Sequence, residues 1–117
     1  MTMVYYHNPR CSKSREGLKI LKEKKVGFAI KEYLKEPLTA SEIKELCNAL
    51  KMSPSEIVRS KEEVFKDLGL HERKMNDQSW YQIIVKNPVL LERPILLKGK
   101  KAVIGRPTER LLELLKK

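Results

Sequence analysis

One cysteine near the N-terminus is the residue that this sequence places best for chemistry. Cys11 follows a short β-prone run and an Asn8-Pro9 turn, and it directly precedes a segment with helical periodicity. The first turn of a helix has unpaired backbone N–H groups and the positive end of the helix dipole, and both favour a thiolate. Basic side chains close in sequence add positive charge: they are His7, Arg10, Lys13 and Arg15. We therefore predict that Cys11 is a nucleophile with a lowered pKa.

The other cysteine, Cys47, has a different setting. It lies at helical spacing with Ile43 and Leu46, which predicts a small core residue. Ser14 occupies the position, three residues after Cys11, where a dithiol motif would have its second thiol. Because a hydroxyl cannot close a disulfide, we expect an external thiol to resolve any covalent intermediate on Cys11.

Three arginines at the ends of predicted elements suit a tetrahedral oxyanion. The planar guanidinium fork matches the geometry of such an anion better than a lysine ammonium does. Arg59 follows a short helix, Arg93 precedes Pro94 at the start of a strand, and Arg106 precedes Pro107. For each of them a surface or capping role is the alternative, since the sequence does not show that they converge.

The elements that must position these residues follow from hydrophobic patterning. Residues 4–6 predict a strand, residues 12–25 a helix and residues 28–33 a second strand, which together form a parallel, right-handed β-α-β unit. Residues 95–104 predict a β-hairpin around Gly99, and a last helix is expected from Pro107 onward.

The middle of the chain is predicted to be helical. Thr39 and Glu42 have the spacing of a capping box, and Ser53 is the expected N-cap of a short helix. Two more helices are predicted around Val64 and from Asp77 onward. At 117 residues we expect an α/β fold with one domain over 1–117, in which helices at about 37–87 form an insertion.

Composition and charge limit the classes of function. The chain has no window of about 18 uncharged apolar residues and no signal-peptide pattern, so we expect a cytoplasmic protein without a membrane partner. The net charge of +10 favours an anionic partner without naming it. A nucleic-acid-binding module rests on that charge alone, because no aromatic-basic motif accompanies it, and we expect no nucleic-acid partner. No Cys/His spacing suits a metal site.

The cysteine segment and the three arginine segments recur in one known family. The first runs from Tyr6 to Arg15 and contains His-Asn-Pro-x-Cys; the others span residues 57–62, 87–95 and 104–107. In this order they resemble the motifs of the glutaredoxin-linked arsenate reductase family (ArsC type), and the resemblance covers nearly the whole chain. It implies a thioredoxin-like fold with the helical insertion between β-α-β and β-β-α halves, and a cis peptide at Arg93-Pro94.

The resemblance also implies roles for individual residues. Cys11 would be the nucleophile toward arsenate, and the oxyanion ligands would be Arg59, Arg93 and Arg106. The residues that would support the thiolate are His7, Asn8, Ser14 and Arg15. No bound cofactor or metal is expected, since glutathione would be the thiol co-substrate and glutaredoxin the protein partner. The sequence departs from the well-studied members in its anion loop, at Arg10, Ser12 and Lys13.

A regulator is the alternative to an enzyme. The same family outline includes thiol-stress transcription regulators of the Spx type, which bind RNA polymerase and sense oxidation through Cys-x-x-Cys. Ser14 replaces the second cysteine of that motif here, which favours the enzyme.

Overall fold

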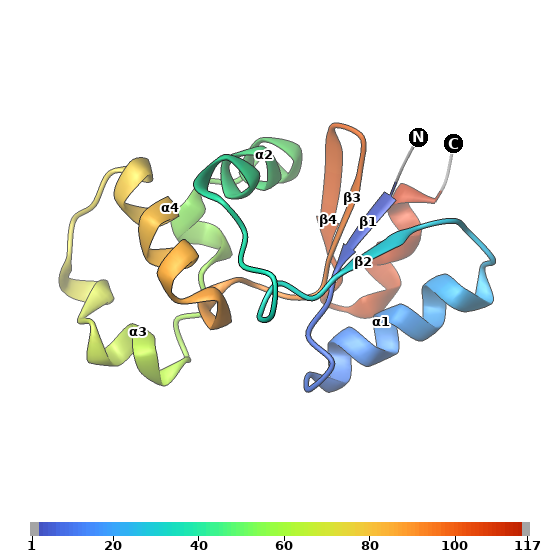
Figure 1. Ribbon diagram of the computed structural model, residues 1–117, viewed down its shortest axis with the longest axis horizontal. Helices are drawn as coiled ribbons and strands as arrows, with labels where there is room; N and C mark the ends of the chain where they lie inside the picture. Colours follow the sequence, from blue (N-terminus) through green and yellow to red (C-terminus); the bar gives the residue numbers. More distant parts are fainter. Residues whose placement is uncertain (1–2, 116–117) are drawn as a thin grey trace. The chain divides into compact units, whose positions relative to one another are not determined.

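The chain divides into two compact units. The computed structural model describes residues 3–115 (Figure 1), and within them one unit contains the residues up to Glu36 and from Arg93 onward, while the other spans Pro37–Glu92. The predicted insertion at about 37–87 lies wholly within the second unit.

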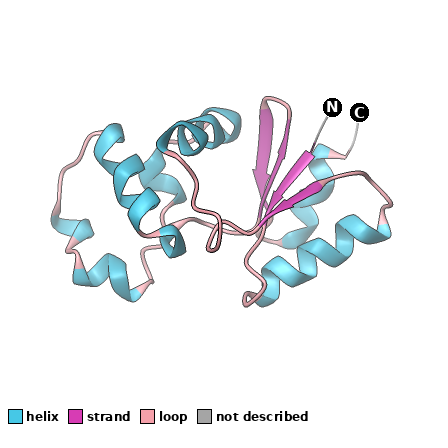
Figure 2. Cartoon of the chain, in the orientation of Figure 1, coloured by secondary structure: helices cyan, strands magenta, loops and turns pink. Residues whose placement is uncertain are grey.

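A mixed four-stranded sheet forms the centre of the first unit (Figure 2). Its strands are β1 (Met3–Tyr6), β2 (Ala29–Lys31), β3 (Ile95–Lys98) and β4 (Lys101–Ile104), in the order β2-β1-β3-β4. β1 runs parallel to β2 and antiparallel to β3, and β3 pairs with β4 as a hairpin. The parallel β-α-β unit and the hairpin are therefore confirmed.

Two helical elements pack against this sheet: α1 (Ser12–Glu23) and the 3-10 helix η4 (Thr108–Leu114). Buried side chains from the sheet, α1 and η4 form one cluster, which consists of Met3, Tyr5, Leu21, Leu96, Val103 and Leu111. Burial of a large apolar side chain contributes about 1.5–3 kcal/mol, so this core fixes α1 on the sheet. The last helix was predicted correctly in position, but it has 3-10 geometry.

β2 is shorter and more exposed than the sequence predicted. The alternation over residues 28–33 suggested a half-buried strand, yet only Ala29–Lys31 is strand and Ile30 is 45% exposed. The reason is that β2 lies at the edge of the sheet and pairs only with β1. Tyr33, which follows the strand, is fully buried.

The second unit is helical. Its elements are α2 (Ala40–Leu50), η1 (Pro54–Ile57), α3 (Glu63–Asp67), η2 (Leu70–Glu72), α4 (Asp77–Lys86) and η3 (Pro88–Leu90). The capping box of α2 is confirmed: the Glu42 N–H donates to Thr39 Oγ1 over 3.1 Å, and the Thr39 N–H donates to Glu42 Oε1 over 3.0 Å. Ser53 lies at the predicted N-cap position of η1, but its side chain makes no capping hydrogen bond.

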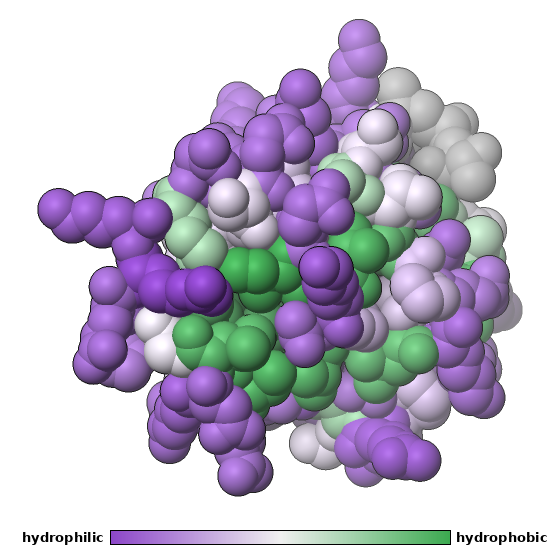
Figure 3. Space-filling view, turned by 60° about the vertical axis from the view of Figure 1, so that its left-hand side comes forward, coloured by the Kyte–Doolittle hydropathy of each residue, from purple (hydrophilic) through white to green (hydrophobic). Residues whose placement is uncertain are grey.

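The face of the molecule shown in Figure 3 is mainly polar. On this face, hydrophilic side chains surround a smaller group of hydrophobic ones. Across residues 3–115, none of the helices combines the length and the apolar character that crossing a membrane requires.

Candidate active site

Cys11 is the N-cap residue of α1. Its backbone is extended, with φ −94° and ψ 123°, and its carbonyl accepts the first helical hydrogen bond from the Arg15 N–H over 3.0 Å. The Cys11 N–H donates to the Asn8 carbonyl over 3.0 Å, which closes the turn between β1 and α1. The predicted placement of Cys11 at a helix start is confirmed, and its side chain is partly exposed.

Opposing effects act on the acidity of the Cys11 thiol. Partial burial alone would raise its pKa, but a hydrogen bond from Arg93, backbone hydrogen bonds from Ser14 and Lys13, and the positive charge of Arg93 together outweigh burial. The Cys11 pKa therefore lies below its ordinary value. The sequence suggested neighbouring cations as the cause; the main cation is instead Arg93, from the far end of the chain.

Arg93 lies beside Cys11 at the start of β3. Burial disfavours its charged form, but the hydrogen bond to Cys11 and the negative charge that Tyr33 or Cys11 can carry keep the Arg93 pKa above its ordinary value. The guanidinium therefore stays charged. The Arg93-Pro94 peptide is cis, as the family resemblance implied, and the Arg106-Pro107 peptide is cis as well.

Ser14 connects the turn before Cys11 to the first turn of α1. Its hydroxyl oxygen accepts a hydrogen bond from the Asn8 N–H over 2.9 Å and lies 2.8 Å from His7 Nδ1. The Tyr5 hydroxyl donates to the Ser14 carbonyl over 2.6 Å. All four side chains are buried, so they fix the backbone from which the Cys11 side chain projects.

His7 stabilises this turn through the contact of its imidazole ring with the Ser14 hydroxyl. Burial lowers the pKa of His7. The charge of Glu32 has a smaller raising effect, and the charges of Lys22 and Arg15 have smaller lowering effects. A neutral imidazole is therefore favoured at neutral pH, and the positive charge that the sequence suggested beside Cys11 is not. The contact between His7 and the Ser14 hydroxyl remains as its link to the site.

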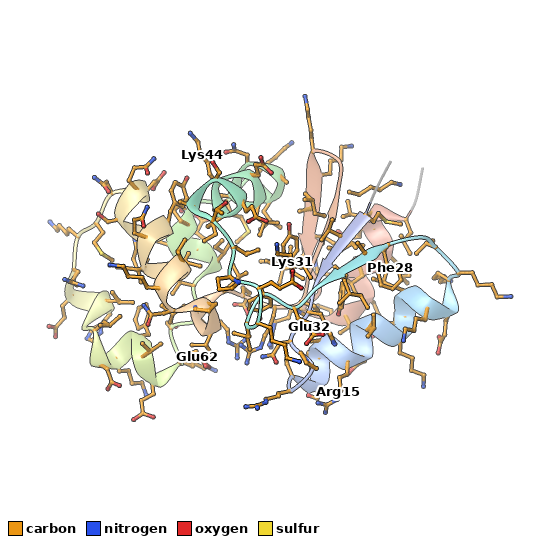
Figure 4. The ribbon with its side chains drawn as sticks, in the orientation of Figure 1. Arg15, Phe28, Lys31, Glu32, Lys44 and Glu62 are labelled. Carbon is orange, nitrogen blue, oxygen red and sulfur yellow. The ribbon has the colours of Figure 1, made fainter. Side chains whose placement is uncertain are left out.

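Arg15 also stabilises the turn between β1 and α1, through an exposed hydrogen bond. Figure 4 places its side chain at the start of α1, and Nη1 donates to the Pro9 carbonyl over 2.9 Å. A second, partly buried hydrogen bond of the turn runs from the Arg10 N–H to Asn8 Oδ1 over 3.0 Å. Both contacts stabilise the turn conformation that aligns Cys11 with the helix.

Arg106 joins the loop after β4 to the start of β3. Its Nε donates to the Arg93 carbonyl over 2.7 Å, and the Gly105 N–H donates to the Pro94 carbonyl over 2.8 Å. Two of the three predicted anion ligands, Arg93 and Arg106, are thus neighbours within the first unit.

Arg59 belongs to the second unit and has carboxylate partners there. Nη1 lies 3.0 Å from Glu92 Oε1, and Nε lies 3.7 Å from Oε2 of Glu62, which is labelled in Figure 4. The Arg59 N–H also donates to the Leu90 carbonyl over 2.7 Å. The joint action of Arg59 with Cys11 stays a prediction.

Cys47 has the properties of a core residue. Its side chain is 3% exposed within α2, and burial, reinforced by Asp77 and Glu56, raises its pKa to about 11. At neutral pH Cys47 is therefore a thiol, and its predicted assignment to the core is confirmed.

Three contacts of site residues were not predicted. Tyr33 interacts electrostatically with Arg93, and the carboxylates of Glu62 and Glu92 pair with Arg59. All three depend on which segments meet in the fold, and local patterns carry no such signal. Within residues 3–115 no group of three or more metal-binding side chains occurs.

Comparison with known proteins adds an independent line of evidence. The model of the ArsC family matches residues 6–114. The chain belongs to the ArsC family. The uncharacterized protein YfgD of Escherichia coli (strain K12) is 44% identical over 110 residues, which cover 93% of this chain and 92% of that protein.

Several relatives, including the following two, carry a functional name. An arsenate reductase of Neisseria meningitidis serogroup B (strain ATCC BAA-335 / MC58) is 38% identical over 107 residues, covering 91% of this chain and 92% of that protein. The solved arsenate reductase from Vibrio cholerae has a TM-score of 0.92 at 36% identity and covers 97% of both chains. The predicted thioredoxin-like α/β fold with a helical insertion is thereby confirmed.

Proposed function

We propose that this ArsC-family protein is an arsenate reductase in which the Cys11 thiolate attacks bound arsenate. The observation that carries the proposal is the pairing of the Cys11 sulfur with the Arg93 guanidinium at the N-terminus of α1, where the Cys11 pKa is lowered. A thiolate is the nucleophilic form of cysteine, and the same cation can bind an oxyanion that approaches it. The names of the similar arsenate reductases support arsenate as the anion.

The first step forms a bond between sulfur and arsenic. The Cys11 sulfur attacks the arsenic atom, and one arsenate oxygen leaves as water after protonation, which gives a thiol ester of arsenate on Cys11. Arg93 and Arg106 would orient the anion and balance the charge on its oxygens, and the role of Arg59 stays a prediction of the family resemblance. No residue other than Cys11 changes its covalent bonds in this step.

Reduction then requires two electrons from external thiols. Glutathione would attack the adduct, and glutaredoxin would take up the glutathionyl group as arsenite leaves. In total, arsenate and two thiols give arsenite, one disulfide and water. An external thiol is expected because Ser14 cannot act as a resolving group and Cys47 remains protonated in the core.

Mass spectrometry after incubation with arsenate and glutathione tests the proposal. We expect an arsenic or glutathione adduct on Cys11, and arsenite production when glutaredoxin is added. Cys11→Ser should lose both the adduct and turnover, whereas Cys47→Ser, as the matched control, should retain them. Arsenate turnover by Cys11→Ser would contradict the mechanism, and polymerase binding without turnover would instead favour the regulator.

A further inference from the structure

The thiol and one of the predicted anion ligands lie on different segments of the first unit. α1 carries Cys11 at its N-terminus, and the loop after β4 carries Arg106. Two hydrogen bonds attach this loop to the start of β3. Arg106 Nε donates to the Arg93 carbonyl over 2.7 Å, and the Gly105 N–H donates to the Pro94 carbonyl over 2.8 Å. Neither of them fixes the loop relative to α1.

A hydrogen bond between Thr108 and Glu16 connects the loop to α1. Thr108 comes two residues after Arg106, as the first residue of η4, and its hydroxyl donates to Glu16 Oε1 over 2.8 Å. Glu16 belongs to α1, five residues after Cys11. The bond therefore joins the helix that carries the thiol to the loop that carries the guanidinium, across 92 residues of sequence.

The two partners of this bond differ in their exposure to solvent. The Thr108 side chain is 1% exposed, and a buried hydroxyl is costly unless it is hydrogen-bonded, so the position of Thr108 depends on Glu16. The Glu16 side chain is 49% exposed, so water can solvate its carboxylate if the hydroxyl is removed. Leu111 of η4 and Leu21 of α1 still share the buried core in that case. Loss of the bond should therefore move the loop without unfolding the protein.

We propose that Glu16 and Thr108 are positioning residues, which set the spacing between Cys11 and Arg106 so that one tetrahedral oxyanion can contact both. Groups that bind one small ligand must be held to within about 0.5 Å by the residues around them. The inference rests on the proposed function in taking Arg106 as an oxyanion ligand. In this role Glu16 and Thr108 contact neither the sulfur nor the anion, and they act through the helix and the loop.

Protection of Cys11 by arsenate measures anion binding without any reductant. Iodoacetamide alkylates Cys11, and the arsenate concentration that halves the alkylation rate gives an apparent Kd; Cys47 does not interfere because it is buried. Thr108→Val should raise this Kd by about two- to tenfold, the range that corresponds to one hydrogen bond. Thr108→Ser keeps the hydroxyl and should bind arsenate like the wild type. An unchanged Kd in Thr108→Val would overturn the proposal.

Two neutral variants of Glu16 separate positioning from charge. Glu16→Gln keeps an oxygen that can accept the Thr108 hydrogen bond, whereas Glu16→Ala does not. Because both variants lose the same negative charge, a weaker affinity of Glu16→Ala for arsenate reports the lost acceptor alone. Equal affinities of the two would contradict the proposal. Glu113→Ala is the control, since that carboxylate lies 3.6 Å from Arg110 within η4 and its removal should leave the Kd unchanged.

A double variant tests whether Thr108 acts through Arg106. In an Arg106→Gln background, Thr108→Val should cause no further change, since the ligand that it positions is gone. An equal loss of affinity in both backgrounds would refute this route. Thermal unfolding shows whether each variant is folded, and if Thr108→Val is not, the two Glu16 variants decide.

The same assay distinguishes this inference from the proposed reaction. Arsenate that protects Cys11 but is not reduced when glutathione and glutaredoxin are added would refute the reaction and leave the positioning role intact. A wild-type protein in which arsenate gives no protection would refute both.

Discussion

At the scale of single residues, the acidity of Cys11 depends on groups from three places. The start of α1 supplies backbone N–H groups, the turn after β1 fixes the Cys11 backbone, and the start of β3 supplies the Arg93 guanidinium. The helix dipole alone contributes about 0.3–1 kcal/mol, which changes an ionisation constant by less than tenfold. A direct guanidinium contact is therefore the stronger influence on this thiol.

Replacing Ser14 by alanine tests the turn. Ser14→Ala leaves the buried Asn8 N–H without its acceptor and removes the contact with His7 Nδ1, so we expect the free energy of unfolding to fall by about 1–3 kcal/mol. Urea denaturation measures the loss.

The control for this substitution is Ser12→Ala. Ser12 is an exposed residue of the same helical turn, and its removal should change stability by less than about 0.5 kcal/mol. Because the Ser14 backbone N–H is kept in Ser14→Ala, the Cys11 pKa should change much less than in Arg93→Gln. Equal stability of the two serine variants would show that the turn does not depend on the hydroxyl.

At the scale of elements, the position of α1 depends on its close approach to β1. A Cβ atom at Gly17 would collide with the Tyr5 hydroxyl and would lie 2.8 Å from Leu111 Cδ1. The Tyr5 hydroxyl is also the donor to the Ser14 carbonyl. The absence of a side chain at Gly17 therefore lets α1 sit close enough for Tyr5 to reach the first turn.

Gly17→Ala should destabilise the protein by about 1–3 kcal/mol through this collision. In an open helix the same change would stabilise by up to about 1 kcal/mol, so the sign of the effect is informative. Gly27→Ala is the control, because a Cβ there meets nothing within 4 Å. Calorimetric unfolding of both variants measures the difference, and a stabilised Gly17→Ala would refute the close approach.

The capping box of α2 gives a prediction for the second unit. Thr39→Ala removes the acceptor of the Glu42 N–H and should lower stability by about 0.5–2 kcal/mol. Ser53→Ala at the start of η1 serves as the comparison, since the Ser53 side chain makes no capping hydrogen bond and should matter little. Chemical denaturation measures the free energy of unfolding of both variants, and an equal loss in the two would contradict the prediction.

The elements themselves were largely predictable because their signals are local. Periodicity, capping residues and turn residues gave the strands, α1, α2 and the hairpin, and they placed Cys11 at a helix start. The electrostatic interaction of Tyr33 with Arg93 was not predictable, since it depends on the pairing of β1 with both β2 and β3. The exposure of Ile30 was missed for a related reason: alternation does not show that β2 is an edge strand.

At the scale of the whole molecule, the two cysteines have opposite effects on stability as pH changes. The Cys11 pKa is lowered on folding, so Cys11 contributes stability above its ordinary pKa, and this contribution is lost as pH falls through the folded value. The Cys47 pKa rises from 9.0 to about 11 on folding. Above pH 9 the unfolded chain therefore ionises Cys47 while the folded protein does not, which favours unfolding.

We expect the stability of the protein to decrease between about pH 9 and pH 11. The Cys47 contribution to this loss is up to about 2–3 kcal/mol, on the basis of 1.36 kcal/mol for each pKa unit. Cys47→Ala removes the titrating group and should make the decrease shallower, even if the variant is less stable at pH 7. Denaturant unfolding across this range measures both slopes, and parallel slopes would rule out Cys47 as the cause.

The first unit is assembled from the two ends of the described chain. Residues 37–92 separate the segment that contains Cys11 from the one that contains Arg93. A ribosome makes the cysteine segment first, so while residues 37–92 are being translated the nascent protein carries a sulfur without its guanidinium partner. Cys11 therefore reaches its final acidity only after the segment with Arg93 has emerged and β3 has joined the sheet.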